Sequence, residues 1–167
     1  MIHSYPSVYQ IGHKAIPNLF EGVVSVQEKI DGSQFSFGII DGELQARSKN
    51  KQLIINAPEK MFARAIETVL SLSLSPGIVY RGEYLEKPKH NTIVYSRVPD
   101  KHIILFDISQ PEGEAYLERR ALEIEAKHVG LELVPEFFRG EIKTMEEFKG
   151  LLDRESVLGG AKMEGVS

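Results

Sequence analysis

The sequence predicts an α+β domain in which antiparallel β-sheets carry flanking helices. Short runs of alternating apolar and polar residues, typical of strands with one buried face, fill much of the first half of the chain. Three other stretches space their apolar residues as helices do. With 167 residues, 42% of them hydrophobic, and no composition shift that would mark a linker, the chain is expected to form a single domain over residues 1–167.

The first two predicted strands flank an Asp31-Gly32 pair. Residues 24–30 alternate between apolar and polar side chains, and residues 34–39 do the same. We therefore expect a β-hairpin that holds Lys29 close to its tight turn. A lysine fixed beside a carboxylate and a glycine is a candidate nucleophile, although its ordinary pKa of about 10.4 must be lowered by burial or by nearby cations.

The next elements continue the antiparallel order and then give way to a helix. Asp41-Gly42 marks a second tight turn, so residues 43–48 should form a third strand. Asn56 is expected to cap a helix whose apolar stripe continues to Leu70. The first 70 residues should therefore contain a short antiparallel meander followed by one core helix.

The second half of the chain combines apolar runs with two further helical patterns. The expected elements are strands over 78–85 and 102–108, a helix over 114–128 stopped by Gly130, an edge strand over 131–138 that contains Pro135, a helix opened by a capping box at Thr144, and a final strand over 159–167. Asp107 follows a long apolar run. It is either a turn residue that caps the next loop or part of a site.

Composition and charge exclude several classes of protein. The net charge of −4 argues against a protein that coats nucleic acid over its whole surface. Basic residues nevertheless cluster at 47–51 and 87–101, so a polyanion should meet the first half of the chain. The absence of cysteine excludes disulfides, thiol nucleophiles and cysteine metal sites. Since no signal peptide or membrane-spanning run is visible, we expect a cytoplasmic protein without membrane contact.

Several common catalytic motifs are missing from the sequence. There is no glycine-rich phosphate loop of the Walker or dinucleotide type, no Gly-x-Ser-x-Gly elbow, and no close group of histidines and acids with metal-ligand spacing. What remains is a lysine with dispersed carboxylates.

The segment Lys29-Ile30-Asp31-Gly32 resembles the signature of the covalent nucleotidyltransferases, the superfamily of ATP- or NAD-dependent DNA ligases, RNA ligases and mRNA capping enzymes. Four later segments resemble the successive motifs of that family, in the same order: Arg47-Ser48-Lys49, Arg81-Gly82-Glu83-Tyr84-Leu85, Ile104-Leu105-Phe106-Asp107-Ile108 and Met163-Glu164-Gly165-Val166. At the fifth position after the lysine, DNA ligases and capping enzymes usually carry arginine, whereas the RNA ligase branch usually carries an amide. Gln34 stands at this position, so the segment is most similar to the RNA ligase branch. The resemblance implies the antiparallel, ATP-grasp-like nucleotidyltransferase fold of an ATP-dependent RNA ligase.

The resemblance also implies a reaction and its partners. Lys29 would attack the α-phosphate of ATP, expel pyrophosphate and carry AMP as a covalent adduct. AMP would pass to an RNA 5′-phosphate, and an RNA 3′-OH would displace it to seal the strand. Each step is phosphoryl transfer, in which positioning and charge neutralisation dominate. Mg²⁺ or Mn²⁺ is therefore expected on the phosphates.

Roles for single residues follow from the same resemblance. Lys29, Glu164 and Asp31 would be catalytic, and Glu164 would also organise the metal ion or its water. The nucleotide would be bound by Glu28, Ile30, Gln34, Arg47, Glu83 and Phe106. Among these, Arg47 would contact the ribose or a phosphate, Glu83 a ribose hydroxyl, and Phe106 the face of the adenine.

The resemblance departs from the family pattern at the C-terminal side. The last motif of the family, a strand with two lysines that engage the ATP phosphates, is expected beyond Glu164 but is not found before Ser167. We therefore expect a domain that is incomplete at its C-terminus. Two alternatives stay open: a non-catalytic nucleotide- or RNA-binding module that retains the pocket, and the adenylation domain of an ATP-dependent DNA ligase.

Overall fold

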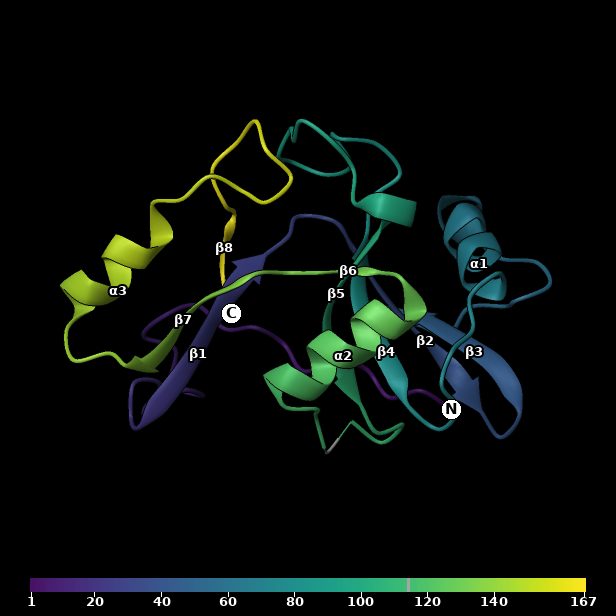
Figure 1. Cartoon of the computed structure of the whole chain (residues 1–167), viewed down its shortest axis with the longest axis horizontal. Coiled ribbons are helices and arrows are strands. Elements are labelled where there is room, and N and C mark those ends of the chain that lie inside the picture. Colours follow the sequence, from purple (N-terminus) through teal and green to yellow (C-terminus); the bar gives the residue numbers. More distant parts are fainter. Residues whose placement is uncertain (114) are drawn as a thin grey trace.

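The computed structural model describes residues 1–113 and 115–167 and contains two sheets that lie side by side (Figure 1). The five-stranded sheet has the order β3-β2-β4-β5-β6 and the three-stranded sheet the order β7-β1-β8. The strands are β1 (Val23–Lys29), β2 (Ser33–Ile40), β3 (Glu43–Ser48), β4 (Val79–Tyr84), β5 (Ile103–Ser109), β6 (Glu132–Leu133), β7 (Glu136–Glu141) and β8 (Gly165–Val166). The helices are α1 (Ala63–Leu70), α2 (Arg119–Val129) and α3 (Met145–Leu152), with 3₁₀ turns at Lys60–Phe62 and Asp100–His102.

The pairing confirms the predicted α+β class. All strand pairs are antiparallel except β5 with the two-residue strand β6. Helices α1 and α2 pack on one face of the five-stranded sheet, and α3 lies beside the three-stranded sheet (Figure 1). No helix in the described part of the chain combines the length and apolar character needed to cross a membrane.

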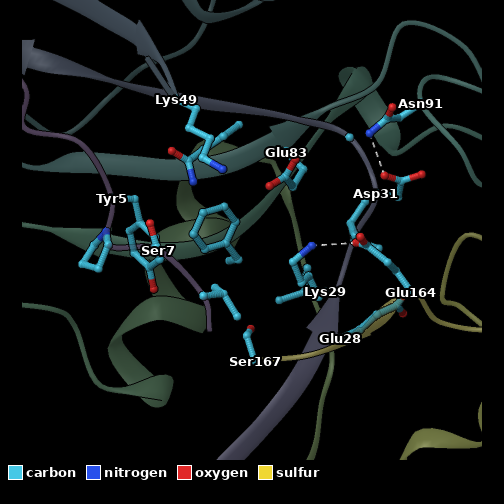
Figure 2. Close-up of a pocket in the computed structure, with 17 residues that line it drawn as sticks. Tyr5, Ser7, Glu28, Lys29, Asp31, Lys49, Glu83, Asn91, Glu164 and Ser167 are labelled. Carbon is cyan, nitrogen blue, oxygen red and sulfur yellow. Dashed lines mark hydrogen bonds and ion pairs between the residues drawn. The ribbon is translucent and has the colours of Figure 1, made fainter. Parts of the chain in front are cut away.

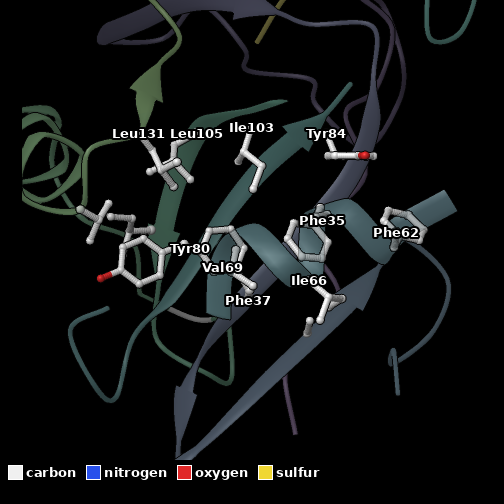
Figure 3. Packing of buried hydrophobic residues seen from close by; sticks show 14 of the residues in the cluster. Phe35, Phe37, Phe62, Ile66, Val69, Tyr80, Tyr84, Ile103, Leu105 and Leu131 are labelled. Carbon is white, nitrogen blue, oxygen red and sulfur yellow. The ribbon is translucent and has the colours of Figure 1, made fainter. Parts of the chain in front are cut away.

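The main core lies on one face of the five-stranded sheet (Figure 3). Alternate residues of β2, β3 and β4 point to this face, as the period of a strand requires. Its aromatic members stack in a row: the ring centroids of Phe35 and Phe37 are 5.2 Å apart, and those of Phe37 and Tyr80 are 5.3 Å apart. Helices α1 and α2 complete this core with buried residues, among them Ile66, Val69, Leu122 and Ala126.

The predicted turn at Asp41-Gly42 is confirmed. It joins β2 to β3, with Ile40 opposite Glu43, and both turn residues have positive φ, 53° at Asp41 and 79° at Gly42. A two-residue hairpin loop of this kind needs positive φ at both positions, which aspartate and glycine tolerate.

The predicted hairpin around Asp31-Gly32 is wrong. Strand β1 pairs with β7 and β8, whereas β2 pairs with β3 and β4, so the chain crosses from one sheet to the other at this point. Gly32 does not adopt the positive φ of a tight turn. It is needed instead for close approach, because a Cβ there would lie 2.9 Å from the carbonyl oxygen of Tyr84.

Two helices begin later than predicted. Asn56 caps no helix, since the chain enters α1 through the 3₁₀ turn Lys60–Phe62. Residue 114, the predicted start of the next helix, lies outside the described residues, and α2 begins at Arg119. Its end agrees with the prediction, because Gly130 adopts the left-handed conformation, with a φ of 76°.

The last elements agree with the sequence in part. The strand predicted over 131–138 is two strands, β6 and β7, which belong to different sheets and flank Pro135. Helix α3 begins as expected, since the Thr144 hydroxyl accepts a hydrogen bond of 3.1 Å from the Glu147 amide. The strand predicted over 159–167 is reduced to β8, which pairs with the end of β1.

Candidate active site

A cavity of about 320 Å³ lies where the two sheets meet (Figure 2). Its walls include the ends of β1 and β8 in the small sheet, the face of the large sheet opposite the main core, the N-terminal segment and the loop after β4. Its lining residues include Tyr5, Ser7, Lys29, Gln34, Lys49, Glu83, Asn91, Phe106 and Glu164. In Figure 2, Lys29 and Glu83 lie between the N-terminal residues on one side and Glu164 on the other.

Lys29, the last residue of β1, is held at the cavity by Glu164. Its Nζ lies 2.8 Å from Glu164 Oε2, and the two side chains are 41% and 34% exposed. Strand β8 sets this geometry, because Gly165 pairs with Lys29 and the preceding residue is Glu164. The structure therefore brings together, from opposite ends of the chain, an accessible amine and a carboxylate that can accept its proton.

Phe106 lies on the cavity side of β5, at a β-bulge. Arg81 is paired with Asp107 and Gly82 with Leu105, so Phe106 is the extra residue between them. A bulge turns side chains away from strict alternation. Leu105 and Ile108 point to the main core, whereas Phe106 packs on the other side of the sheet and lines the cavity.

Glu83 and Gln34 are neighbours on the floor of the cavity. They face each other across β4 and β2 and both line it. Burial raises the pKa of Glu83 to about 8, while the positive charge of Lys29 opposes the shift. Near neutral pH, Glu83 is therefore largely a neutral acid that can donate as well as accept a hydrogen bond.

Asp31 is an anchor for the loop that follows β4. Its buried carboxylate accepts hydrogen bonds from Asn91 Nδ2 at 2.9 Å, Thr92 N at 2.8 Å and Ile93 N at 2.7 Å. Its amide donates to the Tyr95 hydroxyl at 2.9 Å. Asp31 thus lines the cavity with a carboxylate that is already fully engaged, and it places Asn91 on the rim.

Glu28 and Ile30 also border the cavity, but their side chains contact other parts of the protein. The buried Glu28 carboxylate accepts from Ser156 Oγ at 2.6 Å and Val157 N at 2.9 Å. The Ile30 side chain packs with Leu85 in an apolar cluster that is separate from the main core. Both residues therefore present mainly their backbone to the cavity.

Arg47 does not line the cavity in this structure. Its guanidinium donates to the carbonyl oxygens of Ile2 at 3.0 Å, Ser48 at 3.0 Å and Lys49 at 3.3 Å. Lys49, just beyond the end of β3, lines the cavity where Arg47 does not. The sequence places Lys49 within a family-like motif but indicates no role for it.

The N-terminal residues Tyr5 to Val8 form a wall that sequence reasoning missed altogether. Nothing in their sequence predicts it, because the segment has no regular periodicity and its contacts come from residues far along the chain. The same holds for Asn91, which the Asp31 carboxylate positions across a sequence separation of 60 residues.

Carboxylates in the cavity suit a hard cation that is shared with a substrate. Among the described residues there is no group of three or more histidine, aspartate or glutamate side chains that could hold a metal ion by themselves. Mg²⁺ is commonly held by one or two carboxylates, waters and substrate phosphates. Glu164, which faces the cavity, fits that arrangement.

Comparison with known proteins adds a family and a fold. A family model described as RNA ligase matches residues 22–166. Among curated proteins, no relative matches the chain by sequence.

Solved structures of a Naegleria gruberi RNA ligase share the fold. One, with pyrophosphate, has a TM-score of 0.68 at 20% identity and covers 90% of this chain and 48% of that one. A variant with ATP and manganese has a TM-score of 0.71 at 17% identity and covers 98% of this chain and 52% of that one. The chain therefore spans about half the length of these ligases.

Proposed function

Because the chain belongs to the RNA ligase family, we propose that it is the adenylyltransferase domain of an ATP-dependent RNA ligase with Lys29 as the nucleophile. The observation that carries the proposal is the contact of 2.8 Å between Lys29 Nζ and Glu164 Oε2 at the wall of the cavity. Both residues lie within the segment that matches the family.

In the first step, Lys29 Nζ attacks the α-phosphorus of ATP. A nitrogen–phosphorus bond forms while the bond to pyrophosphate breaks, and the proton of the amine passes to Glu164 or to water. The covalent lysyl-AMP divides one difficult transfer into easier ones. In the second step, an RNA 5′-phosphate takes AMP from Lys29; in the third, an RNA 3′-OH displaces AMP and joins the strands.

The remaining side chains of the cavity would bind and orient the nucleotide. Phe106 would stack on adenine, Glu83 would hydrogen-bond a ribose hydroxyl, and Lys49 together with Gln34 would contact phosphate oxygens. A bound Mg²⁺ or Mn²⁺ would neutralise phosphate charge, held by Glu164 and by the phosphates themselves. Structures of the Naegleria gruberi ligase with ATP and manganese and with AMP and manganese support this choice of ligands.

The first step is tested with α-³²P-labelled ATP and either Mg²⁺ or Mn²⁺. We expect label on the wild-type protein and none on Lys29→Ala, and mass spectrometry should place one AMP on Lys29. Lys127→Ala, an exposed lysine on α2, is the matched control and should label as the wild type does. Reversible ATP binding with no adduct would support a non-catalytic module instead.

The nucleic acid is tested separately, with the labelled protein as donor. AMP should pass to a 5′-phosphorylated RNA strand in a nicked duplex faster than to the DNA strand of the same sequence. A preference for the DNA strand would show that the chain is a DNA ligase domain.

A further inference from the structure

The first residues of the chain form what we call the N-terminal strap, residues 2–8, which lies outside the segment that matches the family. The strap contains no helix or strand, yet Ile2 is fully buried in a small cluster with Ile40 and Val79. Four of its residues, from Tyr5 to Val8, line the cavity that contains Lys29. An irregular terminal segment with few contacts would be poorly ordered, so its position requires specific anchors.

Two arginines and a glutamine supply those anchors by binding the strap backbone. The Ile2 carbonyl accepts from Arg47 Nη1 at 3.0 Å and from Gln52 Nε2 at 2.6 Å. The His3 carbonyl accepts from Arg81 Nη1 at 2.6 Å. Arg47, which the sequence predicts at the nucleotide, is thus used here to hold the strap.

Arg81 is the unusual member of this group because it is fully buried. It also donates to Ser36 Oγ and Ser109 Oγ, both at 3.1 Å, but its Nη2 has no hydrogen-bond partner among the described residues. Its guanidinium carbon lies 6.0 Å from the centroid of the Tyr5 ring, within the range of a cation–π contact. Because burying a guanidinium is costly unless its hydrogen bonds are satisfied, the bond that the strap accepts from Arg81 helps to keep this side chain in place.

Tyr5 connects this buried group to the cavity. Its hydroxyl donates to Asp107 Oδ2 at 2.9 Å, and its ring meets Phe106 edge to face, with centroids 4.9 Å apart and an angle of 79°. The bulge in β5 makes this possible, because it places the consecutive residues Phe106 and Asp107 within reach of one ring. Asp107 is therefore not a turn residue: it lies within β5, and it touches the cavity only through Tyr5.

We propose that the N-terminal strap is part of the nucleotide site and that Asp107 and Arg81 are positioning residues, which hold Tyr5 against Phe106 and thereby fix the Phe106 ring for adenine. The inference rests on the proposed function, since it assumes a nucleotide in this cavity. It assigns a role to Asp107 and Arg81, neither of which lines the cavity.

The role predicts a selective loss of base binding. Calorimetric titration with AMP and, separately, with pyrophosphate distinguishes the base from the phosphates. Tyr5→Ala should weaken AMP binding about tenfold, because an aromatic pair of this geometry is lost, and should leave pyrophosphate binding within about twofold of the wild-type value. Tyr5→Phe keeps the ring and loses the hydrogen bond, so it should weaken AMP binding only about threefold.

A double-mutant cycle tests whether Asp107 acts through Tyr5. Asp107→Asn should weaken AMP binding about as much as Tyr5→Phe, and the double variant should be no weaker than either single variant. Tyr9→Ala is the control, because Tyr9 is an exposed neighbour in sequence that stacks on His13 and does not line this cavity. Its AMP binding should equal that of the wild type.

Three outcomes separate the hypotheses. If the wild-type protein neither binds AMP nor forms an adduct with ATP, the proposed function fails, and the inference fails with it. If the wild type binds AMP and Tyr5→Ala binds it equally well, the strap proposal alone is overturned. An equal loss of AMP and pyrophosphate binding in Tyr5→Phe would also overturn it, because that result would indicate a general structural role.

Discussion

The two faces of the five-stranded sheet are built from alternate residues of the same strands but serve different ends. One face is apolar and closed, with Phe35, Phe37 and Tyr80 stacked beneath α1 and α2. The other face carries polar and charged side chains, among them Gln34 and Glu83, and forms the floor of the cavity. Adjacent residues thus have different roles, since Tyr84 is part of the core while Glu83 faces the cavity.

The two faces of the sheet separate the residues that stabilise the fold from those that line the cavity. Burial on the apolar face contributes most of the hydrophobic stabilisation, since that term grows with the apolar area removed from water. The opposite face accepts groups that do not favour folding, such as the buried Arg81 and a Glu83 whose pKa is raised to about 8. Substitutions on the apolar face should therefore affect stability more than AMP transfer. Substitutions on the cavity face should affect AMP transfer more than stability.

The largest effect on stability is expected from Phe37→Ala on the apolar face. Phe37 is fully buried between two aromatic rings, and its removal leaves a cavity that costs about 3–5 kcal/mol of unfolding free energy. Urea denaturation measures this loss, while AMP labelling per folded molecule should not change. Leu70→Ala on α1, where the side chain is exposed, is the control and should shift stability by less than about 0.5 kcal/mol. A similar loss in both variants would contradict the assignment of the core face.

A smaller effect is expected at the crossing between the sheets, where Asp31→Ala leaves two backbone amides and one side-chain amide without an acceptor. The expected cost is about 2–3 kcal/mol. Hydrogen exchange at Thr92 and Ile93 should accelerate more than exchange within β4. Asp31→Asn keeps one oxygen acceptor, so its exchange rates at these amides should lie between those of the wild type and those of Asp31→Ala. Unchanged protection of these amides would show that the carboxylate is not the anchor of this loop.

The sequence predicted those features of the fold that local rules determine. The Asp41-Gly42 turn, β4, β5 and the capped start of α3 were all predictable, because turn chemistry, alternation and capping act over a few residues. The pairing of β1 was not. Alternation fixes which side chains share a face but says nothing about which strand lies alongside, and an Asp-Gly pair suits both a hairpin and an Asp-anchored crossing.

The site was predictable to the extent that it follows motif order. Lys29, Gln34, Glu83, Phe106 and Glu164, recognised by their resemblance to family motifs, all line one cavity. The roles of Lys49 and the N-terminal strap were not predictable, because they depend on contacts between distant segments such as Ile2 with Arg47. The bulge that brings both Phe106 and Asp107 to Tyr5 is equally invisible in an apolar run.

On the polar face, Glu83→Gln should change how stability depends on pH. Glu83 has a pKa of about 8 in the fold, against an ordinary value of 4.5, so the folded state keeps a proton that the unfolded chain releases. The free energy of unfolding should therefore fall as pH rises from about 4.5 to 8. Glutamine mimics the protonated acid and should remove this decline, leaving the variant about 1–3 kcal/mol more stable at pH 8.

Urea denaturation across this pH range measures the Glu83 effect. Glu67→Gln, an exposed glutamate on α1, is the matched variant and should leave the wild-type profile unchanged. Parallel pH profiles for wild type and Glu83→Gln would show that Glu83 is ionised in the fold. The burial of Glu83 would then cost less stability than a pKa of about 8 implies.

The smallest effect on stability, paired with a large effect on AMP transfer, is expected from Glu164→Gln. The Lys29–Glu164 pair is substantially exposed, and such pairs contribute less than about 1 kcal/mol. If Glu164 accepts the proton of Lys29, labelling should slow about 100-fold. Asp153→Asn removes a comparable exposed pair with Lys162 that does not line the cavity, and it should affect neither property. Because both variants replace one exposed carboxylate by its amide, a loss of labelling confined to Glu164→Gln would be due to the position of Glu164 beside Lys29 rather than to the loss of an ion pair.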